Sequence, residues 1–167
     1  MHNDDPMTQD LENTMNEYKN TVYGIAITML INKHEAEDVF QEVFLLYFVK
    51  QLRFDNEAAK KAWLIKVTIN KCRQCNYSKW NRYIDKTTES DSAEVLKITD
   101  DNDKEIYSAV KALSYKLREA VYLHYFVGIS VNETAEMLGV RANTVSMRLS
   151  KAKKLLRKRL EGTYEND

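Results

Sequence analysis

The sequence is poor in the residues that break helices, close disulfides or cross membranes. One proline and four glycines occur in 167 residues, too few for a sheet protein with many tight turns, so helices are indicated. Two cysteines cannot form a disulfide framework, and in a reducing compartment we expect thiols. The longest uncharged apolar stretch, Val22–Ile31, is shorter than the ~20 residues that span a membrane. The segment before it is acidic, unlike a signal peptide. We therefore expect a cytoplasmic protein without membrane insertion.

The chain also lacks a net charge, because 25 Lys and Arg residues balance 25 Asp and Glu residues. This balance hides two basic blocks. Residues 66–86 hold six basic residues against one acid, and residues 141–160 hold eight against none. Between them, residues 87–108 hold seven acids against two lysines. Two basic blocks around an acidic segment suggest two contacts with one polyanion, although solvated helix faces would give the same pattern.

The spacing of apolar residues predicts an N-terminal helical domain. Apolar side chains recur at helical intervals over residues 11–30, and we expect Asn32 to end this helix. After a loop over 50–55, Asn56 is a good N-cap for a third helix. Between them, a second helix is expected over about 35–49, with an apolar side made of Val39, Phe40, Val43, Phe44 and Tyr47.

The third helix, expected to reach about residue 83, carries two different faces, and a break near residues 75–79 is left open. Its core stripe follows the helical period in Ala62, Ile65, Ile69 and Cys72. The other face is polar, basic and aromatic, which is unusual for mere solvation, and comprises Trp63, Lys66, Asn70, Arg73, Gln74, Tyr77, Trp80 and Arg82. For Trp63 we favour a core position, because it heads the buried part of the helix.

Residues 85–104 separate this domain from a second one. The segment is rich in Ser, Thr and acidic residues, with one apolar cluster at residues 95–98, so we expect an acidic flexible linker. Helical periodicity then returns in Ile106, Val110, Leu113, Leu117, Val121 and Tyr125. We expect an all-α protein whose two small helical domains occupy residues 1–84 and 105–167.

The most specific local pattern predicts a helix-turn-helix. Ser130 or Asn132 caps a short helix, and Glu133 stands at capping-box spacing from Ser130. Gly139 stands where this helix must end in a left-handed turn. A second helix begins near Ala142, and its inward residues are Val145, Leu149, Ala152 and Leu156. An ordinary pair of packed helices is the alternative, but the acid-free basic block favours DNA binding.

The second helix of this motif presents small polar groups, a thioether and cations away from its apolar side. Polar and thioether groups can reach base edges in the major groove, while cations bind phosphates and fix the register. These outward residues are Arg141, Asn143, Ser146, Met147, Arg148, Ser150, Lys151 and Lys154.

The sequence offers no constellation for catalysis, a metal or a cofactor. Cys72 and Cys75 form a C-x-x-C pair, but a structural zinc site normally needs four ligands and a redox pair needs a helix N-terminus. We interpret them as core thiols. His124 has no histidine four residues away, and we expect a hydrogen-bonded helix histidine. The glycines are too scattered to form a phosphate loop, so we expect a protein without enzymatic activity.

Three segments, in order, resemble regions of the sigma-70 family of RNA polymerase sigma factors. Residues 36–45, AEDVFQEVFL, are similar to the helix that binds core polymerase. Residues 63–70, WLIKVTIN, are similar to the start of the helix that reads the −10 element and melts the promoter. Residues 117–157 are similar to region 4, which reads the −35 element. Since only a short linker joins regions 2 and 4, the chain resembles the extracytoplasmic function (ECF) class.

The resemblance implies a specificity subunit of bacterial RNA polymerase and assigns roles to residues. The core-polymerase set is Asp38, Gln41, Glu42 and Phe44. The −10 and melting set is Asn70, beside an extruded base, with Arg73, Gln74, Tyr77, Trp80 and Arg82, of which Tyr77 and Trp80 are the stacking candidates. The −35 set is Arg141, Asn143, Thr144, Ser146, Met147, Arg148, Ser150 and Lys151. The implied partners are the β′ coiled coil and β flap of core polymerase, promoter DNA and, as a further candidate, an anti-sigma factor.

Some positions depart from the family pattern and leave the promoter sequence open. Gln74 and Tyr77 stand where Asp and Arg are frequent, Ser146 and Met147 stand where Lys and Ser are frequent, and Thr134 replaces a usual Ile. Two other functions stay as alternatives. One is a stand-alone helix-turn-helix regulator with an N-terminal sensing or dimerisation domain, and the other is a metal or thiol enzyme that uses the two cysteines and a histidine.

Overall fold

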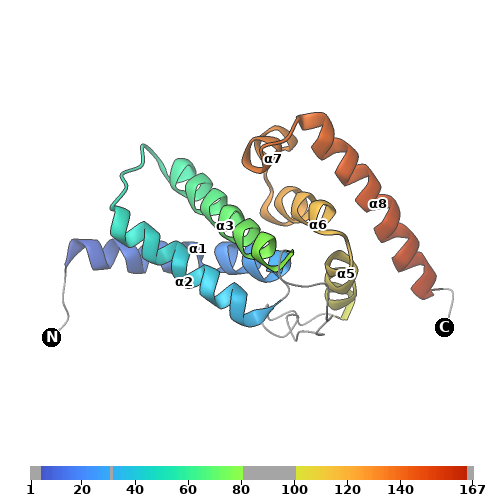
Figure 1. Ribbon diagram of the computed structural model, residues 1–167, viewed down its shortest axis with the longest axis horizontal. Helices are drawn as coiled ribbons and strands as arrows, with labels where there is room; N and C mark the ends of the chain where they lie inside the picture. The colour runs from blue at the N-terminus through green and yellow to red at the C-terminus, as the bar shows by residue number, and fades with distance from the viewer. Residues whose placement is uncertain (1–4, 31, 81–100, 165–167) are drawn as a thin grey trace. The chain divides into compact units, whose positions relative to one another are not determined.

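A computed structural model of the chain describes residues 5–30, 32–80 and 101–164, and in these residues it contains helices and turns without a β-strand (Figure 1). The expected all-α fold is confirmed. The chain forms two compact units, residues 1–88 and 89–167, and each is described by itself. Residues 81–100, which hold Arg82 and most of the expected linker, lie outside the described residues.

The first unit consists of α1 (Pro6–Leu30), α2 (Lys33–Lys50) and α3 (Glu57–Trp80). Each helix packs against the other two. The last seven residues of α1, 24–30, are all buried, as expected for a segment that is apolar all round. The centre of the core is formed by residues with no exposed surface, among them Ile25, Ile27, Val43 and Ile69.

Asparagine caps start two of these helices. Asn32 follows the end of α1 and also caps α2, since its side-chain oxygen accepts a hydrogen bond from the backbone N–H of Glu35 at 3.2 Å. Asn56 caps α3 as predicted, accepting from the N–H of Ala59 at 2.8 Å. Because α3 is one unbroken helix to Trp80, the break left open near residues 75–79 does not occur.

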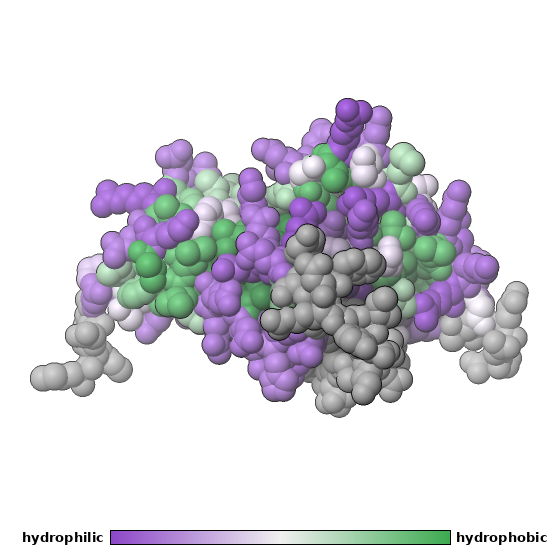
Figure 2. Space-filling view, in the orientation of Figure 1, coloured by the Kyte–Doolittle hydropathy of each residue, from purple (hydrophilic) through white to green (hydrophobic). Residues whose placement is uncertain are grey.

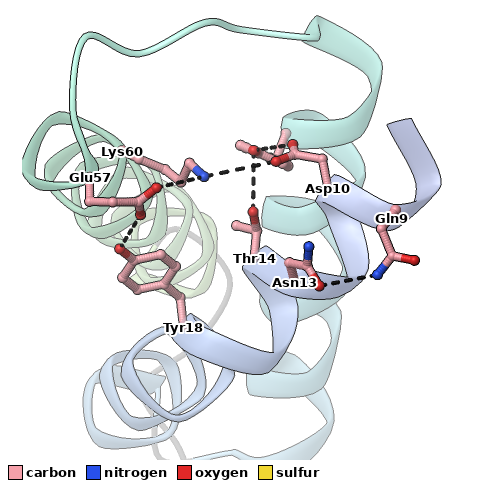
Figure 3. Close-up of polar contacts among 8 residues, drawn as sticks. Gln9, Asp10, Asn13, Thr14, Tyr18, Glu57 and Lys60 are labelled. Carbon is pink, nitrogen blue, oxygen red and sulfur yellow. Dashed lines mark hydrogen bonds and ion pairs between the residues drawn. The ribbon is translucent and has the colours of Figure 1, made fainter. Parts of the chain in front are cut away.

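Polar side chains tie one end of the three helices together (Figure 3). The Tyr18 hydroxyl of α1 donates to Oε2 of Glu57 in α3 at 2.9 Å, and the Tyr47 hydroxyl of α2 donates to Asp10 of α1 at 2.5 Å. Lys60 of α3 lies 3.3 Å from Glu57 and 3.9 Å from Asp10. Burial and these carboxylates raise the pKa of both tyrosines. The network therefore holds both tyrosines as neutral donors.

The second unit consists of α5 (Asp101–Lys111), α6 (Tyr115–Val121), the π-helical segment η1 (Tyr122–Val127), α7 (Val131–Leu138) and α8 (Ala142–Tyr164). Helices α5, α6 and α7 all pack against α8. Their shared core contains Val110, Val121, Ala135, Val145 and Ala152. The backbone of residues 101–104, which the sequence analysis placed in the linker, is already helical in α5.

The segment η1 shifts the helical register and corrects one expectation. A π-helical turn holds more residues than an α-helical turn, so Leu123 is fully buried and Tyr125, which the sequence pattern grouped with the apolar side, is 48% exposed. Gly128 ends the segment with φ 85°, a conformation that glycine adopts without strain. His124 Nδ1 lies 2.7 Å from the carbonyl oxygen of Ile129, which confirms the expected hydrogen-bonded histidine.

The helix-turn-helix is confirmed in detail. Ser130 is the N-cap of α7: its hydroxyl accepts from the N–H of Glu133 at 3.1 Å, and the Glu133 carboxylate accepts from the N–H of Ser130 at 3.2 Å. Asn132 lies inside the helix. Gly139 ends α7 in the left-handed region with φ 66°. The predicted inward residues of α8 join the core, and Leu156 is partly buried against it.

Candidate nucleic-acid interface

Helix α3 separates an apolar side from a polar side. Leu64, Ile65, Ile69 and Cys72 are buried, while Asn70 and Gln74 are exposed and Arg73 is half-buried. Lys66, Asn70 and Arg73 follow the helical repeat and share one face. The side chains of Tyr77 and Trp80, and all of Arg82, lie outside the described residues.

Trp63 belongs to the packing of the first unit. Its ring centroid lies 6.1 Å from that of Tyr47 and 5.9 Å from that of Phe54. Trp63 is half-buried and packs against the edge of the core, and the exposed polar face of α3 begins one turn later.

Helix α8 presents a basic face from its first turn onward. Arg141, Asn143, Ser146, Met147, Ser150 and Lys151 are exposed, and Thr144 is half-buried. Met147 is 72% exposed, so a large apolar side chain stands in solvent among polar and cationic neighbours. Such a side chain can contact a thymine methyl group in the major groove.

Arg148 differs from its neighbours because it turns back onto the protein. Its Nη1 atom lies 3.2 Å from Oε1 of Glu119 in α6, and the two side chains are 15% and 2% exposed. The two residues are 29 positions apart, so no local pattern in the sequence could have paired them.

Helix α2 carries an exposed stripe of mixed character. Asp38, Gln41 and Glu42 are exposed, as a docking face requires, but Phe44 is 3% exposed and packs on Phe40 with ring centroids 4.9 Å apart. The sequence analysis missed two residues of this stripe, Leu45 and Val49, which are 62% and 65% exposed. The exposure of both residues could have been predicted from the sequence, because they continue the helical repeat of Asp38 and Gln41. In Figure 2, hydrophobic groups reach the surface where α2 lies in Figure 1.

Glu42 of this stripe forms an ion pair with Lys71 of α3. Glu42 Oε2 lies 3.1 Å from Lys71 Nζ, and the side chains are 56% and 30% exposed. This ion pair therefore links α2 to α3 within the first unit.

An apolar groove of about 500 Å³ lies among α5, α6 and α8 in the second unit. Leu113 and Leu117 line one side and Leu155 and Leu156 the other, and Lys151, Lys158 and Arg159 add positive charge. A groove of this kind fits an apolar helix with acidic flanks.

The described part of the chain contains no group of three or more His, Cys, Asp or Glu residues placed to hold a metal ion. Cys72 is buried and Cys75 is half-buried. Among the same residues, no helix has both the length and the apolar character needed to cross a bilayer.

Two family models match the chain. Residues 14–77 match sigma-70 region 2, and residues 103–156 match sigma-70, region 4. Among curated relatives, the ECF RNA polymerase sigma factor SigW of Bacillus subtilis is 27% identical over 161 residues, covering 86% of this chain and 84% of SigW. The RNA polymerase sigma-H factor of Pseudomonas aeruginosa is 22% identical over 160 residues, covering 87% and 83%.

Two solved structures share the fold. The sigma factor RpoE, in complex with the anti-sigma factor NepR from Bartonella quintana, aligns with a TM-score of 0.73 at 20% identity, covering 92% of this chain and 98% of RpoE. CnrH, in complex with the cytosolic domain of CnrY, aligns with a TM-score of 0.67 at 21% identity, covering 93% and 90%. Together with the matches to regions 2 and 4, the chain belongs to the sigma-70 family and is an ECF sigma factor, a non-enzymatic protein of transcription initiation.

Proposed function

We propose that the first unit docks on core RNA polymerase through α2 and holds the opened −10 strand through α3, while α8 reads the −35 duplex. The observation that carries this proposal is the exposed basic face of α8, which a helix-turn-helix displays and which holds no acid over residues 141–160. Cations on that face neutralise phosphates, and the displaced counterions favour association.

The exposed stripe of α2 is the proposed contact with the β′ coiled coil. Leu45 and Val49 supply apolar area at its centre, and Asp38, Gln41 and Glu42 supply polar contacts beside it. Apolar side chains surrounded by polar ones are typical of binding hot spots. Phe44 supports this surface from the core instead of touching a partner.

The polar face of α3 is the proposed site for the separated strand. Flipping a base costs a few kcal/mol in lost stacking, and an aromatic side chain can recover about 1–3 kcal/mol per base. Asn70 is placed in solvent where it can bond an extruded base, with Arg73 and Gln74 next to it. For Tyr77, Trp80 and Arg82 the proposal rests on the family resemblance alone.

The proposed −35 contacts are the exposed residues of α8. Ser146, Met147 and Ser150 face outward between flanking cations and suit base edges, while Arg141 and Lys151 suit phosphates. Asn143 and Thr144 lie in the first turn of α8, which enters the groove first in this type of motif.

Two further partners fit the second unit and the fold. The groove among α5, α6 and α8 is the proposed seat of the β flap, because its apolar walls and cations suit an amphipathic segment. RpoE, which shares the fold, was solved with an anti-sigma factor, and we extend that class of partner to this chain. These partners place the proposed activity in the cytoplasm.

Run-off transcription with core RNA polymerase and a library of genomic promoter fragments tests the proposal. We expect discrete start sites only when the chain is added. The double substitution L45E and V49E should abolish them, because it puts charge on the α2 stripe. Asn20→Glu, at an exposed position of α1, is the matched control and should change nothing.

Two results would contradict the proposal. The first is random initiation with and without the chain. The second is tight, specific promoter binding by the chain alone, with no effect of core enzyme, which would favour a stand-alone regulator.

A further inference from the structure

Two cations on opposite flanks of the buried stripe of the recognition helix α8 reach to neighbouring elements. Val145, Leu149 and Ala152 form that stripe. With about 3.6 residues per turn, positions 148 and 153 fall on either side of it. Arg148 reaches Glu119 of α6, and Lys153 Nζ lies 5.4 Å from the ring centroid of Tyr125 in η1.

The Arg148 contact is the more buried of the two. Glu119 is 2% exposed and the Arg148 side chain is 15% exposed, so water screens the pair little. The neighbouring Arg118 donates to the carbonyl oxygens of Lys111 and Leu113 at 3.0 and 3.3 Å. Two adjacent residues of α6 thus hold the end of α5 and the middle of α8.

The rotation of α8 about its own axis decides which side chains meet base edges. A helix with side chains is about 10–12 Å wide, so a rotation of ~20° moves its surface atoms by about 2 Å. That displacement is enough to lose a hydrogen bond to a base. Ser146, Met147 and Ser150 lie within two residues of Arg148 and would move with it.

We propose that Arg148 and Glu119 form a positioning pair which fixes the rotation of α8 on α6, so that Arg148 sets base selectivity without contacting bases or phosphates. The inference rests on the proposed function of α8 as the −35 reader. It assigns a specific role to Glu119, a residue outside the DNA-facing surface.

Promoter binding by the holoenzyme, measured over a series of KCl concentrations on promoter and non-promoter DNA, tests the proposal. Each lost phosphate contact lowers the slope of log K against log salt by about 0.9. Arg141→Met, at an exposed cation that directly precedes the same helix, should show this loss. Arg148→Met and Glu119→Gln should instead leave the slope unchanged and reduce the ratio of specific to non-specific binding by on the order of tenfold, the effect of one misread base pair.

Two further variants separate positioning from unfolding. Arg148→Lys keeps a cation opposite Glu119 and should recover part of the selectivity. The double variant E119M and R148M replaces the pair by apolar groups, an exchange that buried ion pairs often tolerate, so it should keep the wild-type helical circular dichroism. Its salt slope should equal that of the wild type.

A fall of about 0.9 in the slope of the folded double variant, with full selectivity in Glu119→Gln, would overturn the positioning role and make Arg148 a phosphate contact. A wild-type holoenzyme without promoter preference would instead refute the proposed function of α8, and the positioning role with it.

Discussion

The two units join their helices by different means. The described residues of the first unit form three helices of 25, 18 and 24 residues. Their ion pairs involve carboxylates that stay largely exposed, those of Asp10, Glu42 and Glu57. The second unit has an 11-residue helix, segments of 7, 6 and 8 residues, and then α8. Its central link is a buried ion pair.

This difference follows from the lengths of the helices in the two units. Helices shorter than ~12–15 residues are marginal alone, because nucleation is costly. The short helices of the second unit therefore depend on caps and on individual side chains that reach the next helix. The long helices of the first unit depend on continuous apolar packing. Single substitutions at polar positions should accordingly matter more in the second unit.

The largest expected effect comes from removing one partner of the buried pair. Arg148→Ala leaves the Glu119 charge buried and should lower the free energy of unfolding of the second unit by about 3 kcal/mol. Lys71→Ala removes a partner of the exposed pair with Glu42 in the first unit and should cost about 0.5 kcal/mol. Urea unfolding followed by far-ultraviolet circular dichroism measures both. Equal costs for the two substitutions would remove the contrast between the units.

The next effect concerns the cap of α7. Ser130→Ala removes the hydroxyl that accepts from Glu133 and should destabilise the second unit by about 1 kcal/mol. Asn132→Ala is the matched control, because Asn132 lies one residue inside the helix and caps nothing in the structure. Amide hydrogen exchange over residues 131–138 measures the local opening. Faster exchange in the Asn132 variant than in the Ser130 variant would contradict the assigned cap.

Alkaline pH should affect the two units with opposite sign. The folded first unit raises the pKa of Tyr18 and Tyr47, so above pH ~10 the unfolded chain loses protons that the native state keeps, and stability falls. Burial lowers the pKa of Lys111 in the second unit. There the unfolded chain binds more protons as pH approaches ~10.5, so stability rises over that window.

Both tryptophans belong to the first unit, so their fluorescence follows its unfolding at each pH. Tyr18→Phe should cost about 1 kcal/mol at neutral pH, because its donation to Glu57 is lost, and should flatten the decline above pH 10. An unaltered decline in this variant would remove Tyr18 as its source. Amide exchange in α5 and α6 follows the second unit in the same samples.

The smallest expected change in stability comes from substituting two buried threonines, one in each unit. Thr134 in α7 has no hydrogen-bond partner for its hydroxyl among the described residues, whereas Thr68 in α3 donates to the carbonyl oxygen of Leu64 at 2.6 Å. Thr134→Val should therefore stabilise the second unit by about 0.5 kcal/mol, and Thr68→Val should destabilise the first by a similar amount. Thermal unfolding of both variants shows the sign. A loss of stability in Thr134→Val would reveal a partner for its hydroxyl.

The sequence predicted those parts of the fold that depend on residues close to one another in the chain. The capping box at Ser130, the left-handed turn at Gly139 and the inward stripe of α8 each depend on residues within one or two turns. The exposed face of α3 is of the same kind, since helical spacing alone separates Asn70 from Ile69.

The parts that could not be predicted depend on distant contacts or on a change of helical type. The pairing of Arg148 with Glu119 could not be predicted, because Glu119 belongs to another helix. Tyr125 was predicted on the apolar side because the prediction assumed about 3.6 residues per turn. The π-helical turn that exposes it could not be recognised from that spacing. For Phe44, helical spacing predicted the apolar side of α2, where the structure buries it, while only the family resemblance placed it among the polymerase contacts.

The central claim is the division of labour between α8, which holds duplex DNA, and α3, which holds a separated strand. Permanganate footprinting of the −10 region, together with filter binding of the closed complex, tests it most directly. In Asn70→Ala we predict that thymine reactivity falls while closed-complex binding stays near the wild-type level, and in Arg141→Ala we predict that both fall together. An equal loss of both signals in Asn70→Ala would contradict the claim.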